Sequence, residues 1–219
     1  MEATNINDLS ELIKEKEKVY TFRMLEKKDA YELMVLMSDA FVYYNDAFKI
    51  LESIDSDMNN DACLQEYVLM VEKNLSFGAF HGEKLVSACL SYDLSSKSDM
   101  HVDDGKEPSQ AMKEIGKMIK TLLDVYSDTK SLPKNEISYL SHLATRADYC
   151  QQNLAIICSY LSAVESRKQG FKKMLTGAGH IGTFKAFTKI FKKYDKVTEI
   201  KEVREQPIFM MSLIAALAP

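Results

Sequence analysis

The order of short β-rich runs and helical patterns in residues 136–217 constrains the fold more than any other feature of the chain. It predicts a strand at 137–146, a tight turn at 148–155 and a long helix at 153–170. A strand at 172–176, a helix at 184–194 and two closing strands at 196–203 and 208–217 follow. A strand that reaches a helix through such a turn leaves several backbone N–H groups without partners. These donors, together with the positive end of the helix dipole, favour a phosphate or pyrophosphate group.

The first half of the chain contains further elements. Three more strands are predicted, at 19–24, 75–80 and 85–92, the last two joined by a four-residue hairpin loop. Four more helices are predicted, at 26–41, 47–51, 62–73 and 112–126. A polar break at 55–61 separates the second of these helices from the third. Residues 1–18 form a polar extension with a short helix, and 94–107 form a flexible insert. Because strands alternate with helices across 19–219, we expect one domain with a mixed α/β sheet.

Composition and charge exclude several classes of function. The 219 residues are 46% hydrophobic and 27% charged, which is typical of a soluble globular protein. A net charge of −4 gives no basic surface for nucleic acid, and no apolar run approaches the roughly 20 residues of a membrane span. The polar, charged residues 1–18 do not have the pattern of a secretory signal. The four cysteines form no CxxC pair, and no spacing suits a metal site, so a reducing, cytoplasmic location without a metal is predicted.

From the strand at 137–146 to the closing hairpin, the element order resembles the GCN5-related N-acetyltransferase fold. With the hairpin at 75–92, the resemblance covers nearly the whole chain. It implies one α/β (α+β) domain whose mixed central sheet has about seven strands, is splayed at the cofactor site and carries helices on both faces. It also implies acetyl-CoA as co-substrate, with its pyrophosphate on the turn and its pantetheine arm beside the helix at 184–194.

The turn before the long helix matches the family motif at one of three defined positions. The motif reads Gln or Arg, two residues, Gly, one residue, then Gly or Ala, and the best overlay places Cys150, Asn153 and Ala155 there. Asn153 departs from Gly but tolerates a left-handed backbone better than most residues, and the binding groups are backbone N–H donors. The resemblance therefore implies eight cofactor-binding residues: Leu143, Thr145, Gln151, Gln152, Asn153, Leu154, Ala155 and Arg167. Arg167 has a second interpretation, as a charge that complements the C-terminal helix dipole.

Three side chains are candidates for the chemistry. Within the family, the resemblance is closer to the arylalkylamine N-acetyltransferase branch, in which a Glu after the first helix can act as the base. Asp46 would stand at the position of this Glu. Alternatively, Asp46 is the N-cap of the next helix. His142, with Ser141 on the other face of its strand, is a second candidate base or a hydrogen-bonded core histidine. Phe191 stands where the family often has a Tyr acid. Tyr194, on nearly the same helix face, would then be the acid, or it would only pack.

Two functions remain open at this point. The first is an acetyl-CoA-dependent N-acyltransferase, in which the primary amine of a small molecule attacks the thioester directly, since no nucleophilic Cys–His pair is legible. The second is a catalytically inactive protein of this fold that serves as a structural or interaction subunit of a larger assembly. The departures at Asn153 and Phe191 favour the second function, and the element order favours the first.

Overall fold

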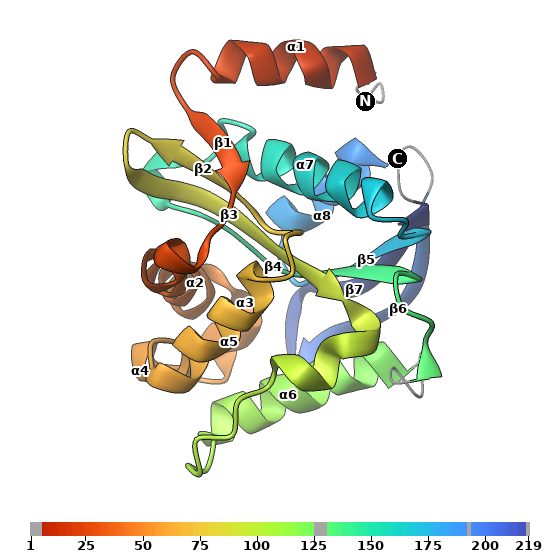
Figure 1. Ribbon diagram of the computed structural model, residues 1–219. Helices are drawn as coiled ribbons and strands as arrows, with labels where there is room; N and C mark the ends of the chain where they lie inside the picture. The colour runs from red at the N-terminus through yellow and green to blue at the C-terminus, as the bar shows by residue number, and fades with distance from the viewer. Residues whose placement is uncertain (1–5, 125–130, 192–193, 218–219) are drawn as a thin grey trace.

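Seven strands form one mixed sheet in the computed structural model, which describes residues 6–124, 131–191 and 194–217 (Figure 1). The strands are β1 Thr21–Met24, β2 Phe77–His81, β3 Lys84–Asp93, β4 Ile137–Thr145, β5 Lys173–Ala178, β6 Tyr194–Val203 and β7 Gln206–Leu217. Their order across the sheet is β1-β2-β3-β4-β5-β7-β6. The central neighbours β4 and β5 are parallel, and the remaining neighbours of the described sheet are antiparallel. The prediction of a mixed sheet of about seven strands is confirmed.

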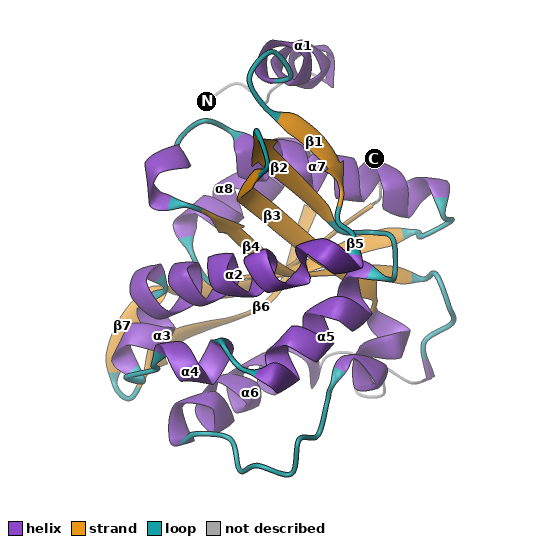
Figure 2. Ribbon diagram, turned by 60° about the vertical axis from the view of Figure 1, so that its left-hand side comes forward, coloured by secondary structure: helices purple, strands orange, loops and turns teal. Residues whose placement is uncertain are grey.

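Helices cover both faces of this sheet, as the two views in Figures 1 and 2 show. The α-helices are α1 Ile6–Lys16, α2 Ala30–Tyr44, α3 Asp46–Ile50, α4 Asp55–Met58, α5 Asp61–Val71, α6 Gln110–Leu123, α7 Leu154–Lys168 and α8 Ile181–Ile190. Three 3-10 helices accompany them, η1 Lys27–Asp29, η2 Leu94–Met100 and η5 Ala147–Tyr149. Helices α7 and α8 pack on one face, whereas α2, α5 and α6 pack on the other. The expected two-sided arrangement is therefore also confirmed.

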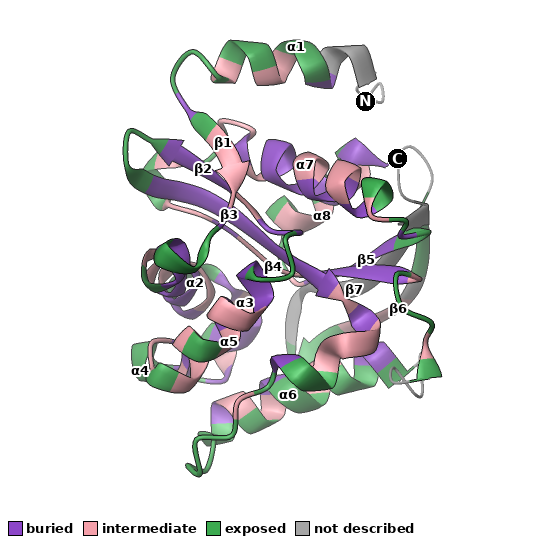
Figure 3. Ribbon diagram, viewed as in Figure 1, coloured by how far each residue is buried: buried purple, intermediate pink, exposed green. Residues whose placement is uncertain are grey.

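Each face of the sheet has its own hydrophobic core. Leu33, Met37 and Ile115 belong to the core beneath α2, α5 and α6. Ile156 and Phe187 belong to the core beneath α7 and α8. Strand β3 is buried along almost its whole length because both cores contact it, as the burial colouring of Figure 3 shows. A strand covered on both sides explains why its sequence reads as a nearly continuous apolar run.

The sheet divides between its two parallel strands. The register of β4 with β5 runs from Ile137 opposite Lys173 to Leu140 opposite Thr176, and ends there. Beyond Leu140, β4 continues beside β3 as far as Thr145, while β5 continues beside β7. The two halves of the sheet thus separate at the carboxyl end of β4, which confirms the predicted splay. Among the described strands, none pairs with β4 on this edge beyond Leu140.

The polar break at 55–61 contains a short helix, α4, that the sequence pattern did not predict. Its first turn is stabilised by carboxylates: Asp57 accepts hydrogen bonds from the backbone N–H of Ile54 and the hydroxyl of Ser53, both at 2.9 Å. Asp55 accepts from the buried Ser38 hydroxyl of α2 at 2.6 Å. Acidic side chains near a helix N-terminus favour the helix, so the acidic character of the segment helps it to fold.

Other boundaries also differ from the sequence prediction. The β2–β3 hairpin pairs His81 with Lys84, so its loop has two residues rather than four. Helix α8 ends at Ile190, four residues before its predicted end. Residues 125 and 126 of the predicted helix 112–126 lie outside the described residues. The insert predicted at 94–107 begins with η2, whose ends Leu94 and Met100 are buried.

Candidate active site

The turn between β4 and α7 carries two left-handed residues that are not glycine. Gln151 and Asn153 have φ angles of 64° and 65°, so Asn153 adopts the conformation expected where the family motif has Gly. The Asn153 side chain makes no capping hydrogen bond, and the first helical bond runs from Ile157 N–H to the Asn153 carbonyl. The N–H groups of the first turn of α7 therefore remain available to an external acceptor.

The other predicted cofactor residues lie around this turn, with one exception. Leu154 is buried in the core, so its side chain is not available to a ligand and only its N–H can contribute. The Thr145 hydroxyl is 2.8 Å from that of Ser87, and Leu143 packs partly buried beneath α7. Arg167 is exposed in the last turn of α7, about 20 Å along the axis from the turn. The structure does not bring Arg167 together with the other seven, and its role stays a prediction.

A β-bulge in β4 changes which face its central residues take. Leu90 of β3 pairs with His142, and the next residue pairs with Leu140, so Ser141 is an extra, unpaired residue. The expectation that Ser141 and His142 lie on opposite faces is wrong, because the bulge breaks the alternation of the strand. Instead, the Ser141 hydroxyl is 2.9 Å from His142 Nδ1 and 4.0 Å from the sulfur of Met70 in α5.

His142 lies among aromatic rings beside the division of the sheet. Phe41 of α2 and Tyr67 of α5 each meet the imidazole edge-to-face, with ring centroids 5.6 Å away. Burial lowers the pKa of His142 to about 4, although the side chain keeps a partial opening to solvent. The imidazole is therefore neutral near pH 7, and burial makes it a weaker base than an exposed histidine. No signal in the sequence indicated Tyr67 or Phe41 as its neighbours, since they come from two different helices.

Asp46 is not the helix cap that one interpretation of the sequence proposed. Asn45 caps α3, because its side chain accepts from the Ala47 N–H at 3.0 Å. Asp46 is half-exposed in the first turn and lies 3.6 Å from the ammonium of Lys49. The ring of Phe48, on the same short helix, meets Phe41 at 5.2 Å, and Phe41 in turn meets the His142 imidazole. Helix α3 and His142 thus lie on the same face of the sheet, and the contact between them runs through Phe48 and Phe41 rather than through Asp46.

Tyr194 is not on the helix where the sequence placed it. It begins β6, pairs in register with Ala216 of β7, and its ring meets Phe184 of α8 edge-to-face at 6.2 Å. Strand pairing with β7 takes the chain out of the helix that the local pattern would have continued. Phe191 is buried against Phe187, with ring centroids 4.4 Å apart, and so belongs to the core.

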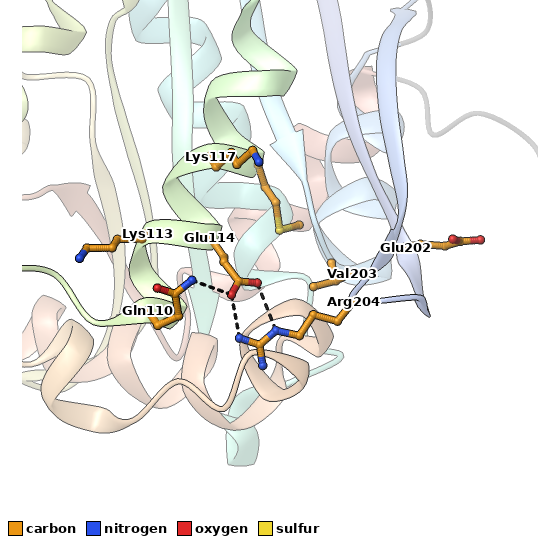
Figure 4. Close-up of a pocket in the computed structure, with 8 residues that line it drawn as sticks. Gln110, Lys113, Glu114, Lys117, Glu202, Val203 and Arg204 are labelled. Carbon is orange, nitrogen blue, oxygen red and sulfur yellow. Dashed lines mark hydrogen bonds and ion pairs between the residues drawn. The ribbon is translucent and has the colours of Figure 1, made fainter.

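A hollow of about 520 Å³ lies away from these residues, between α6 and the tip of the β6–β7 hairpin. Figure 4 shows its charged lining, in which Glu114 accepts two hydrogen bonds from Arg204 and one from Gln110. None of the predicted site residues lines it. Within the described chain, no three His, Cys, Asp or Glu side chains gather in a way that could hold a metal ion. No described helix is long and apolar enough to cross a membrane.

Comparison with solved structures identifies the fold. The C-terminal condensation domain of Ebony, in complex with β-alanyl-dopamine, superposes with a TM-score of 0.68 at 13% identity, over 90% of this chain and 98% of that one. Arylalkylamine N-acetyltransferase 2 from Aedes aegypti gives 0.66 at 14% identity, over 91% and 99%. PaiA N-acetyltransferase from Thermoplasma acidophilum, in complex with coenzyme A, gives 0.54 at 11%, over 90% and 98%. No protein-family model and no curated protein matches the sequence.

The chain therefore has the GCN5-related N-acetyltransferase fold over nearly its whole length, and its neighbours include arylalkylamine and polyamine N-acetyltransferases. At 11–14% identity, this likeness establishes the fold and does not by itself establish an activity.

Proposed function

We propose that this protein transfers an acetyl group from acetyl-CoA to the primary amine of a small molecule. One arrangement carries the proposal: the sheet divides after Leu140, and the uncapped start of α7 follows at the same end of β4. The open edge of β4 offers backbone N–H and C=O groups to an extended chain such as pantetheine. The free N–H groups of α7 suit its pyrophosphate. A neighbour of the same fold in complex with coenzyme A supports this choice of donor.

The proposed chemistry is direct attack of the amine on the thioester. The amine nitrogen forms a bond to the acetyl carbon and the carbon–sulfur bond breaks. The departing thiolate of CoA then receives a proton. His142, neutral and beside the division of the sheet, accepts the proton of the amine directly or through a water, with Asp46 as the other candidate base. Tyr194 is the proposed acid. Among the described residues, no cysteine makes a hydrogen bond to a histidine, which favours direct attack over a covalent enzyme intermediate.

The acceptor is proposed to be an amine with an aromatic or other apolar part. Phe41 and Tyr67 contact His142, and Phe48 contacts Phe41, so the surroundings of His142 are apolar and suit such a substrate. The arylalkylamine N-acetyltransferase from Aedes aegypti among the neighbours supports this substrate class. We place the reaction in the cytoplasm, where a reducing environment suits the four free cysteines.

Calorimetry with CoA on the full chain tests the proposal first. We expect measurable binding; an absence of heat at millimolar CoA would contradict it.

Release of thiol from acetyl-CoA in the presence of tyramine, agmatine or spermidine then tests turnover. His142→Ala is expected to lower kcat/KM about a hundredfold, the usual contribution of a general base. His101→Ala is the matched control, since His101 lies on the insert, is exposed and pairs with Glu66 of α5. Equal rates for His142→Ala, Asp46→Asn and the wild type would remove both proposed bases.

A non-catalytic subunit of an assembly is the second candidate, and one observation favours it. Phe191 has no proton to donate and is buried in the core, while Tyr194 lies on β6 rather than α8. The position of the family's Tyr is thus filled by a packing residue. Binding of CoA without release of thiol for any amine would support this second function.

A further inference from the structure

The turn that precedes α7 is held from outside by a cluster of three rings. Tyr20, which lies just before β1, donates a hydrogen bond from its hydroxyl to Oε1 of Gln152. The Tyr149 hydroxyl, within η5, is 3.1 Å from Nδ1 of His81 at the end of β2. The Tyr20 ring meets His81 at 5.5 Å and Tyr149 at 6.3 Å, both edge-to-face. Three segments far apart in the sequence therefore meet at this one turn.

The turn needs such support because its backbone is strained. Gln151 and Asn153 both adopt left-handed conformations without being glycine, and this conformation is less favourable for Gln151 than for Asn153. Strained residues persist only where the surrounding structure determines their conformation. The Gln152 side chain lies between the two, and Tyr20 is the residue that holds it.

Tyr20 is well placed to act as a fixed anchor. Its side chain is 7% exposed and belongs to the core beneath α7, together with Leu9 of α1. Its own N–H donates to the Lys16 carbonyl at 2.8 Å, so it follows directly from the end of α1. In Figure 1 the N-terminal segment and the turn before α7 lie next to each other, as the Tyr20–Gln152 bond requires.

We propose that Tyr20 is a positioning residue: its hydroxyl holds the turn at 151–153 in the conformation that presents the N–H groups of α7 to the pyrophosphate. Tyr20 lies directly after the N-terminal extension 1–18, and its N–H is held by the Lys16 carbonyl of α1. The inference rests on the proposed function for its ligand. The anchoring of the turn itself can be tested without any ligand.

Tyr20→Phe is the decisive variant, because it removes the donor and keeps the packed ring. In the full chain, amide hydrogen exchange over 149–156 is expected to become about five- to tenfold faster, the effect of losing one hydrogen bond. CoA affinity is expected to fall by a similar factor. The affinity for pantetheine, which lacks the pyrophosphate, should stay unchanged. A general structural defect would instead lower the affinities for CoA and for pantetheine alike.

Two further variants complete the test. Gln152→Ala should reproduce the effect of Tyr20→Phe, and the double variant should be no worse than either single one. Tyr92→Phe makes the same chemical change in a buried tyrosine of the other core and should alter neither measurement. Unchanged exchange in Tyr20→Phe overturns the anchoring role, and faster exchange with unchanged CoA affinity overturns the positioning role. If the wild type does not bind CoA, the proposed function fails, while the exchange experiment still decides whether Tyr20 anchors the turn.

Discussion

At the scale of single residues, His142 is expected to make the stability of the protein depend on pH. Its pKa is lowered to about 4 in the native state from an ordinary value of 6.5. As the pH falls from 6.5, the unfolded chain takes up the proton before the native state does, so stability is lost down to about pH 4. Between pH 7.5 and 4.5, we expect the free energy of unfolding of His142→Gln to fall by about 1–2 kcal/mol less than that of the wild type. A fully buried ring would contribute about 1.4 kcal/mol for each unit by which its pKa is lowered, and the expected difference is smaller because this ring is partly open to solvent.

Urea unfolding at the two pH values measures this difference. His101→Gln provides the control, since His101 is an exposed histidine just after η2 whose ring pairs with Glu66 of α5. An equal loss of stability in the wild type and in His142→Gln would mean that the imidazole is not desolvated as the structure indicates.

Asn153 allows a second prediction at this scale. Glycine carries no penalty at a φ of 65°, so Asn153→Gly is expected to raise stability by a few tenths to about 1 kcal/mol and to preserve CoA binding. Asn153→Val places a β-branched residue in the same conformation and should lower stability by about 1–2 kcal/mol or more. Thermal unfolding of the two variants measures both effects. A valine variant as stable as the glycine variant would show that the turn is not left-handed.

Single residues also show where reasoning from the sequence stops. The left-handed conformation of Asn153 could be anticipated, because it depends on the residue and on its place before a helix. The position of His142 could not, because the bulge at Ser141 arises from the register between β3 and β4, which no local pattern records. The capping role went to Asn45 rather than Asp46, a shift of one residue that local preferences do not distinguish.

At the scale of elements, α7 rests on the sheet through buried serines as well as through apolar side chains such as Leu154 and Ile156. Ser162 and Ser166 donate to Ser91 and Ser138, both at 2.8 Å, and all four side chains are buried. Small polar pairs let the helix approach the strands closely, which fixes the position of its N-terminus. The location of the candidate pyrophosphate site therefore depends on these pairs.

The Ser138–Ser166 pair gives the prediction that belongs to this scale. Ser166→Ala alone leaves a buried hydroxyl without its partner and is expected to cost about 1–2 kcal/mol of stability. Ser138→Ala/Ser166→Ala removes both hydroxyls and should cost less than the sum of the two single changes. Urea unfolding of the three variants measures the coupling. Strictly additive losses would contradict a direct hydrogen bond between the two serines.

Elements with a strong apolar repeat were predicted well, and those decided by long-range pairing were not. The apolar run that became β3 and the amphipathic pattern of α6 lie close to their predicted places. Helix α8 was predicted to end four residues too late, because the pairing of Tyr194 with Ala216, not a breaker residue, starts β6 there. This error carried the candidate acid from a helix onto a strand.

At the scale of the whole molecule, the element order predicted the fold even though the binding motif departs from the family pattern. The type of each element is predicted from the spacing of its apolar residues, and packing against the two cores requires this spacing along the whole element. The binding motif, by contrast, depends on a few backbone positions. Gln151 and Asn153 adopt left-handed conformations without glycine, and the Tyr20 cluster contacts the same turn. The turn thus has left-handed backbone where the family motif has glycine, although its side chains differ from the motif.

The two candidate functions differ in how the whole molecule should respond to the cofactor. A ligand that binds only the native state stabilises it by about 2.7 kcal/mol at a concentration one hundred times its Kd. For a chain of 219 residues this corresponds to a rise in Tm of roughly 5–10 °C. We expect CoA to produce this shift in thermal unfolding, and pantetheine to produce a smaller one because it cannot use the N–H groups of α7. A protein that retains only the scaffold would unfold at the same temperature with and without CoA. Because the shift requires no turnover, it separates loss of binding from loss of catalysis, the distinction that Phe191 and Tyr194 leave open.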